Sequence, residues 1–113
     1  MKSKILALSK NEDFKSLLNK KKLSNKYVTI FFGILKKKDI KKLNISFVAK
    51  KKIGNAVKRN KIKRRLRNIL HEATKKISLK LKYSYLVIAK SSMLNDNYTN
   101  IKETLFQSFE KIK

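Results

Sequence analysis

Residues 50–70 read KKKIGNAVKRNKIKRRLRNIL, a segment with ten lysines and arginines, no acidic residue and a single glycine. With about 3.6 residues per helical turn, the apolar residues of this segment and of the positions just after it cover about one third of the circumference. They are Ile62, Leu66, Ile69, Leu70, Ala73 and Ile77. This spacing predicts a long helix that packs along one side against a core. Because 113 residues have room for only one modest core, we expect a single domain over residues 1–113, built around this helix.

The other side of the predicted helix is polar and basic. Asn60, Arg64, Arg67 and His71 follow one another at spacings of four, three and four residues, and we call these four residues the polar ridge. Like charges one turn apart destabilise a helix by roughly 0.2–0.5 kcal/mol per pair, whereas arginine pairs with phosphate through two parallel hydrogen bonds. The polar ridge is therefore expected to face away from the core and to contact phosphates. The alternative is a helix face that is solvated by water alone.

The overall composition points to the same kind of partner. A formal net charge of +24 and a mean hydropathy of −0.47 place the chain near the boundary with charge-driven disorder. A polyanion relieves the self-repulsion, since neutralised phosphates release counterions, so we expect a nucleic-acid partner and a free protein that anions make more ordered. The chain has no cysteine and no apolar run that suits a signal peptide or a membrane span. We therefore expect a cytoplasmic protein without membrane contact.

Apolar periodicity predicts three strands and two further helices around the basic segment. One predicted helix covers residues 11–19, and another begins near residue 97. The predicted strands cover residues 27–35, 43–47 and 83–89. In the first strand one side carries Val28, Ile30, Phe32 and Ile34, and the other side carries Phe31. We expect the first two strands to pair antiparallel, and the third to lie parallel to the second after the helical crossover. The predicted class is α+β, with helices on a small mixed sheet in the order α-β-β-α-β-α, with or without one extra short strand.

Residues that could carry catalysis are scarce. The seven acidic residues show no spacing typical of a metal-binding carboxylate pair, and serine and threonine occur without a nucleophile motif. We interpret His71 as a ridge residue rather than a catalytic one. Gly54 is interpreted as a turn residue before the helix cap Asn55, although N–H groups at a helix start can also hold a phosphate. The sequence thus predicts a binding protein with no catalytic residue and no metal ligand of its own.

Two stretches resemble the protein subunit of bacterial ribonuclease P. The long one is KKIGNAVKRNKIKRRLRNIL, residues 51–70, and the short one is KNEDF, residues 10–14. The resemblance implies a protein cofactor of a ribozyme, an endonuclease whose RNA subunit removes the 5′ leader of precursor tRNA by metal-dependent hydrolysis. It also implies a two-layer α/β sandwich whose strand–helix–strand crossover is left-handed, against the usual right-handed rule. The expected partners are the ribonuclease P RNA subunit and precursor tRNA, with Mg²⁺ bound through the RNA, and no protein oligomer is expected.

The same resemblance assigns residues to two RNA contacts. The expected contacts with the RNA subunit are Lys51, Lys52, Gly54, Arg59, Asn60, Lys61, Lys63, Arg64 and Arg67. The expected leader-binding cleft, between the first helix and the sheet, is lined by Phe14, Leu18 and Phe31. Three of these residues depart from the usual ones of the family. Lys61 stands where arginine is usual and loses the bidentate guanidinium group, Leu18 stands where an aromatic residue is common, and Phe31 where tyrosine is common.

Two other functions fit parts of the sequence. A ribosomal or DNA-binding protein would explain the charge but not the pattern of residues 50–70, and a stand-alone nuclease would need catalytic groups that the sequence does not display. Dependence of precursor tRNA cleavage on both this chain and a large RNA distinguishes the three functions.

Overall fold

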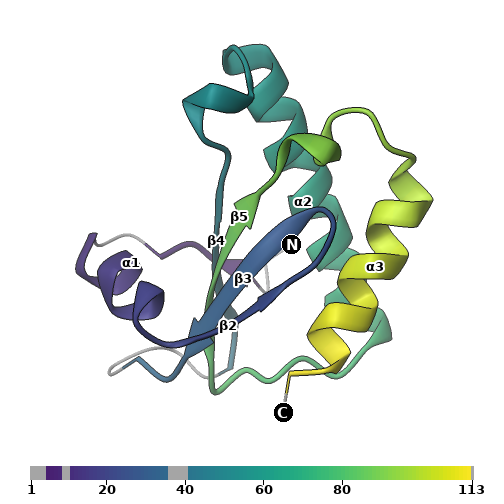
Figure 1. The fold of residues 1–113 in the computed structure, drawn as a ribbon. Helices are drawn as coiled ribbons and strands as arrows, with labels where there is room; N and C mark the ends of the chain where they lie inside the picture. The colour runs from purple at the N-terminus through teal and green to yellow at the C-terminus, as the bar shows by residue number, and fades with distance from the viewer. Residues whose placement is uncertain (1–4, 9–10, 36–40, 113) are drawn as a thin grey trace.

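The computed structural model describes residues 5–8, 11–35 and 41–112 of the chain. These residues form one mixed sheet with helices on its two faces (Figure 1). In chain order the elements are β1 (Ile5–Leu6), α1 (Asn11–Leu18), β2 (Lys21–Ser24), β3 (Val28–Gly33), β4 (Leu43–Val48), the 3₁₀ turn η1 (Lys51–Ile53), α2 (Ala56–Lys76), β5 (Ser84–Ala89), the 3₁₀ turn η2 (Ser91–Met93) and α3 (Tyr98–Glu110). The predicted order of the longer elements is confirmed, and two short edge strands, β1 and β2, join them.

The strand order across the sheet is β1-β4-β5-β3-β2. The predicted antiparallel pairing of residues 27–35 with residues 43–47 is wrong, because β5 lies between these two strands. It pairs antiparallel with β3, where Ile30 is opposite Val87, and parallel with β4, where Ile45 is opposite Tyr85. Residues 84–87 are buried on both faces of the sheet, which suits a central strand better than an edge strand. The predicted parallel relation between the strands on either side of α2 is confirmed.

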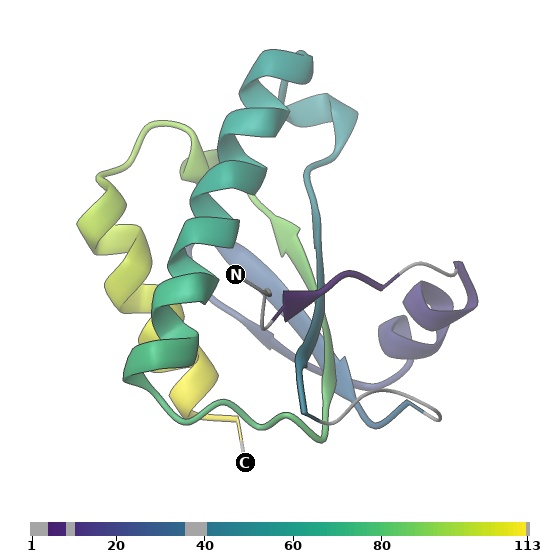
Figure 2. The same cartoon turned by 180° about the vertical axis from the view of Figure 1, so that it is seen from behind.

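Helices α2 and α3 cover one face of the sheet, and α1 covers part of the other (Figures 1 and 2). The main core lies between the sheet and the α2–α3 layer, and a smaller cluster of Leu8, Leu17 and Leu86 lies under α1. With α2 in front of the sheet and the parallel strands pointing up, β5 lies to the left of β4, so the crossover is left-handed (Figures 1 and 2). The α/β sandwich that the resemblance implies is therefore present.

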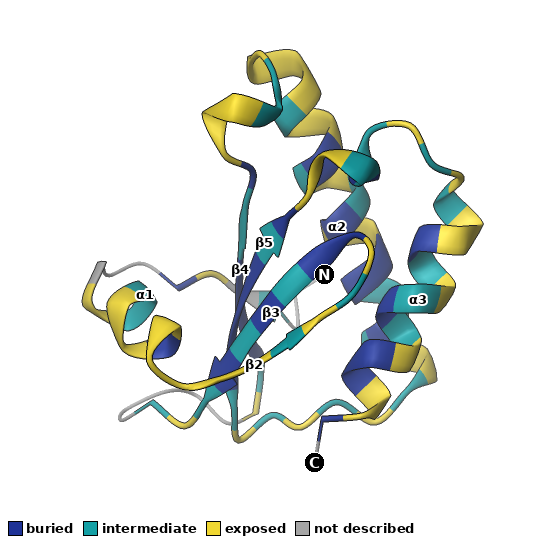
Figure 3. Ribbon diagram, viewed as in Figure 1, coloured by how far each residue is buried: buried dark blue, intermediate teal, exposed yellow. Residues whose placement is uncertain are grey.

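The apolar side of α2 is buried as its periodicity predicts (Figure 3). Its fully buried residues are Ile62, Leu66, Ile69, Leu70 and Ala73. The helix ends at Lys76, and its C-cap residue Ile77 is only half-buried. Helix α2 is thus held along its length by the sheet, and its opposite side stays open.

No helix of the described residues is long and apolar enough to cross a membrane.

Helices α2 and α3 each begin at an asparagine cap. The Asn55 side chain accepts a hydrogen bond of 3.0 Å from the Lys58 N–H, and the Asn97 side chain accepts one of 2.8 Å from the Thr99 N–H. Each bond satisfies one of the free N–H groups of the first turn. Gly54 precedes the first cap with a φ of 157°, a backbone conformation that favours glycine. The predicted turn and cap before the basic helix are confirmed.

Strand β3 separates its two faces largely as predicted. Val28, Ile30 and Phe32 lie in the main core, and Phe31 is half-buried on the α1 side. Ile34 does not continue the core face, because the strand ends at Gly33 and the Ile34 side chain is 63% exposed.

Candidate nucleic-acid interface

Three residues of the polar ridge, Asn60, Arg64 and Arg67, are exposed, and the fourth, His71, is half-exposed. The prediction that this ridge faces away from the core is confirmed. Among the described residues, Arg64 and Arg67 have no ion pair and no hydrogen bond through their side chains. Their guanidinium groups are therefore available to an outside ligand. That the ligand is RNA stays a prediction at this point.

Two arginines of α2 are placed differently from the ridge. The Arg65 guanidinium donates hydrogen bonds of 3.0 Å to the Met93 carbonyl and 3.1 Å to the Asp96 carbonyl, so it ties α2 to the segment that leads into α3. Arg59 is half-buried, and its Nε atom is buried without a hydrogen-bond partner in the described part of the chain. Of the expected element Arg59-Asn60-Lys61, only Asn60 and Lys61 are fully at the surface.

The 3₁₀ turn η1 and the start of α2 lie at the end of the sheet where the parallel strands finish. Lys51 and Lys52 are exposed on this turn. Lys52 lines a hollow of about 320 Å³ together with Lys50 and Lys90. Lys90 Nζ donates to Ser24 Oγ at 2.9 Å and to the Asn25 carbonyl at 2.6 Å, which holds this cation in place. Sequence reasoning missed Lys90, since its position depends on the pairing of β5 with β3.

The residues expected in the leader-binding cleft meet in part. Phe14 and Phe31 both pack against the small cluster of Leu8, Leu17 and Leu86, on the α1 face of the sheet. Leu18 lies one helical turn after Phe14 and is 48% exposed. The two aromatic rings are therefore brought to one surface, and Leu18 extends that surface outward along α1.

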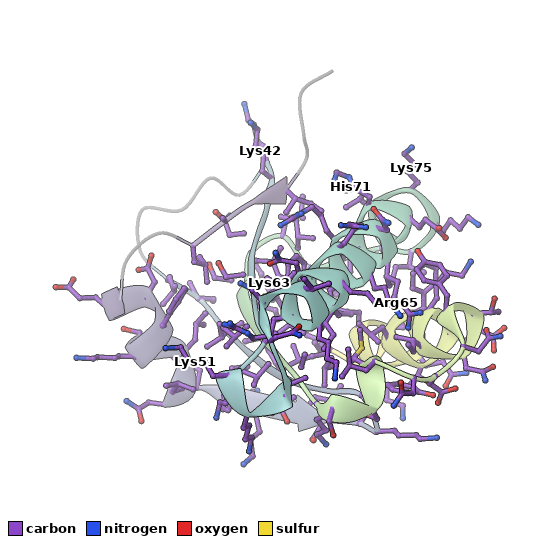
Figure 4. The ribbon with its side chains drawn as sticks, turned by 90° about the horizontal axis from the view of Figure 1, so that it is seen from above. Lys42, Lys51, Lys63, Arg65, His71 and Lys75 are labelled. Carbon is purple, nitrogen blue, oxygen red and sulfur yellow. The ribbon has the colours of Figure 1, made fainter. Side chains whose placement is uncertain are left out.

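A pocket of about 490 Å³ connects the two expected RNA contacts. Phe14 of α1 lines it on one side, and Lys63, Arg67 and His71 of α2 line it on the other. Residues 45–48 of β4 and Ala49 line it between them. Figure 4 shows Lys63 and His71 on the side of α2 toward β1, and Arg65 on the side toward α3. The sequence assigned Phe14 to the leader and Lys63 and Arg67 to the RNA subunit, but the fold places all three around one pocket.

Asp96 is the described acid whose pKa is shifted by its surroundings, and its contacts hold separate parts of the fold together. Asp96 accepts a hydrogen bond from the Tyr27 hydroxyl and one of 2.7 Å from the Asn97 N–H, and it lies 3.3 Å from Lys26 Nζ. The Tyr27 bond is the main reason that the pKa of Asp96 is lowered to about 2, and the same bond raises the pKa of Tyr27. Within the described ranges no three His, Asp or Glu side chains gather where they could hold a metal ion.

A sequence model of the Ribonuclease P family matches residues 3–113 of this chain. The chain belongs to the ribonuclease P protein family. This match confirms the resemblance that residues 51–70 and 10–14 indicated, and it extends over nearly the whole chain.

Curated members of the ribonuclease P protein family match at similar levels. The ribonuclease P protein component of Carboxydothermus hydrogenoformans is 34% identical over 110 residues, which cover 94% of this chain and 90% of that protein. The ribonuclease P protein component of Mycoplasma mycoides is 32% identical over 106 residues, which cover 94% of each.

Solved structures of ribonuclease P proteins share the fold. The Staphylococcus aureus protein matches with a TM-score of 0.79 at 25% identity, over 95% of this chain and 94% of that one. The Thermotoga maritima protein matches with a TM-score of 0.79 at 24% identity, over 96% of this chain and 98% of that one, and supports the fold alone.

Proposed function

We propose that this chain is the protein subunit of ribonuclease P, which binds the catalytic RNA subunit and the 5′ leader of precursor tRNA and assists the endonucleolytic removal of that leader. The observation that carries the proposal is the exposed side of α2 in a chain of this family, where Arg64 and Arg67 have no partner among the described residues. The relatives compared above are ribonuclease P protein components. We expect the complex to act in the cytoplasm, without membrane contact and without a protein oligomer.

Asn60, Arg64 and Arg67 of the polar ridge are the proposed contact with the RNA subunit. Arg64 and Arg67 carry full charge and have no carboxylate partner in the described part of the chain, so phosphate binding breaks no existing ion pair. Each neutralised phosphate releases condensed counterions, which drives association and makes it depend on salt. A fixed helix presents these groups at set spacings, which suits a folded RNA surface better than a flexible basic tail would.

The surface of Phe14 and Phe31 is the proposed leader contact. Single-stranded RNA is commonly held by stacking of bases on aromatic rings beside a positive groove. Both rings are half-buried, so each is fixed by packing while part of it stays accessible. Leu18 can add apolar contact but no stacking surface.

Hydrolysis is proposed to reside in the RNA subunit. No described group of acids or histidines could hold a metal ion, and Asp96 is engaged with Tyr27 and Lys26. We therefore place the Mg²⁺ ions of the holoenzyme on the RNA. The protein contributes by binding and orienting the precursor and by neutralising phosphate repulsion, which reduces the Mg²⁺ concentration that the RNA needs.

Reconstitution tests this function. At low Mg²⁺, cleavage of a precursor tRNA is expected only when the chain and its cognate large RNA are combined. Activity of the protein without RNA would identify a stand-alone nuclease. A protein that binds RNA but leaves cleavage by the large RNA unchanged would instead be a binding module of another kind.

A further inference from the structure

The pocket between α1, β4 and α2 exists because the edge of β4 is covered for only part of its length. Strand β1 pairs only with Leu43 and Asn44. Ser46 Oγ then accepts a hydrogen bond of 2.8 Å from the Leu8 N–H and donates one of 3.2 Å to the Leu8 carbonyl, the last contacts of residues 5–8 along this strand. Beyond this point residues 47–49 line the pocket, and the described residues leave this edge of the sheet open to a strand of another molecule.

On the α2 side, the pocket is lined by two cationic side chains and one imidazole. Lys63, Arg67 and His71 are spaced by four residues and thus lie above one another along the helix. None of the three side chains has a hydrogen-bond or ion-pair partner in the described part of the chain. The neighbouring acid, Glu72, is engaged on the α3 side, where its carboxylate lies 3.2 Å from Lys102 Nζ and accepts a 3.4 Å bond from the Tyr98 hydroxyl. The wall therefore has no acid to neutralise it.

We propose that this pocket binds a backbone phosphate of the 5′ leader as the strand passes from the Phe14 side of the sheet around the open edge of β4 to α2, with His71 as a phosphate ligand beside Lys63 and Arg67. The inference rests on the proposed function and adds a path and a ligand to it. An imidazole ring carries an N–H that can donate to a phosphate oxygen, so His71 suits this role.

The shape of the pocket favours the leader over the RNA subunit. A pocket of about 490 Å³ has the size of a site that encloses a small ligand. A single strand can enter such a hollow, with a base against Phe14 and its phosphate against α2, because its bases are not stacked in a duplex. A folded RNA subunit presents a broad surface, which fits the exposed side of Asn60 and Arg64 instead.

The test compares His71→Ala with Lys75→Ala in the reconstituted holoenzyme. Lys75 lies one turn further along α2, is exposed and does not line the pocket, so its replacement controls for loss of a donor from the helix. Affinity is measured for precursor tRNA with its full leader and for the same tRNA with the leader shortened to a single nucleotide. The affinity of each variant for the RNA subunit alone is measured in parallel.

His71→Ala is expected to weaken binding of the full-leader substrate by about tenfold to 150-fold, the range for loss of one hydrogen bond to a charged group. Binding of the shortened substrate and of the RNA subunit is expected to stay at the wild-type level, as are all values for Lys75→Ala. Phe14→Leu should reduce the same full-leader affinity, and its effect should not add to that of His71→Ala if one strand touches both residues.

Three results would overturn the inference. Equal full-leader affinity for His71→Ala and the wild type would remove His71 from the leader path. A loss confined to RNA-subunit affinity would make the pocket part of the RNA-subunit interface. A wild-type protein that does not distinguish the two substrates would overturn leader binding itself, as proposed above, and the path with it.

Discussion

At the scale of single residues, Asp96 fixes the segment that leads into α3. Asp96 takes hydrogen bonds from Tyr27 and Asn97, and its backbone carbonyl takes one from Arg65. These contacts join β3, α2 and the start of α3 at one point. Asp96 therefore has a structural role, because its carboxylate is bound to Tyr27, Asn97 and Lys26.

The Asp96 pKa predicts how stability changes in acid. The pKa falls from 3.8 to about 2 on folding, so the unfolded chain takes up the proton more readily than the folded one. The contribution of Asp96 is therefore complete above about pH 4 and is lost as the pH falls toward 2. Urea unfolding between pH 5 and pH 2 should show a smaller loss of stability for Asp96→Asn than for the wild type. Glu103→Gln, at an exposed position of α3, should behave as the wild type, and equal acid sensitivity of all three proteins would contradict the prediction.

Gly54 is the residue whose backbone most restricts substitution. Its φ of 157° is a conformation that L side chains rarely adopt, and an added Cβ would lie 2.7 Å from Lys58 Cδ. We expect Gly54→Ala to lower the free energy of unfolding by about 1–3 kcal/mol. Gly33→Ala is the matched control, because its Cβ would also meet a lysine side chain at 2.7 Å, that of Lys20, but without the unusual φ. Equal losses in the two variants, measured by denaturant unfolding, would show that the lysine contact and not the backbone causes the effect.

At the scale of elements, the two sides of α2 have different roles. Its apolar side lies in the main core, and its opposite side carries Asn60, Arg64 and Arg67 to the surface. This division is local, because it depends only on the spacing of residues within one helix, and the sequence predicted it correctly. The role of Arg65 could not be predicted in this way, because the Met93 and Asp96 carbonyls that it binds belong to a segment that is remote in sequence.

Replacement of one ridge arginine tests the role of this surface. Arg64→Ala should weaken binding to the RNA subunit and reduce the steepness of its salt dependence by about one phosphate contact. The side chain is exposed and unpaired in the described structure, so folding stability should change little. Lys111→Ala, an exposed position after α3, controls for the loss of one positive charge far from α2. Wild-type affinity and salt slope in Arg64→Ala would exclude this part of the ridge from the interface.

At the scale of the whole molecule, charge opposes folding. A net charge of +24 is carried by a domain whose Cα radius of gyration is 13.3 Å, so the cations lie close together. Folding concentrates this charge and unfolding spreads it, and a bound polyanion reverses the balance.

Anions should therefore stabilise the free protein. We expect sulfate to raise the thermal midpoint and the helical circular dichroism signal more than chloride does at equal ionic strength, because a ligand of the folded state stabilises it by mass action. Screening alone would give equal effects of the two salts. A protein that is fully folded in low salt and insensitive to both salts would contradict the prediction.

The sequence by itself determined what depends on neighbours along the chain: the sides of α2, the caps at Asn55 and Asn97, and the core face of β3 up to its end at Gly33. Each follows from a periodic pattern or a local hydrogen bond. Only the tertiary structure decided that β5 separates β3 from β4, that Lys90 is held by Ser24 and Asn25, and that Phe14 shares a pocket with Lys63, Arg67 and His71. The physical reason is that strand order and the meeting of α1 with α2 across β4 are set by which surfaces bury together, and no spacing within a single segment contains that information.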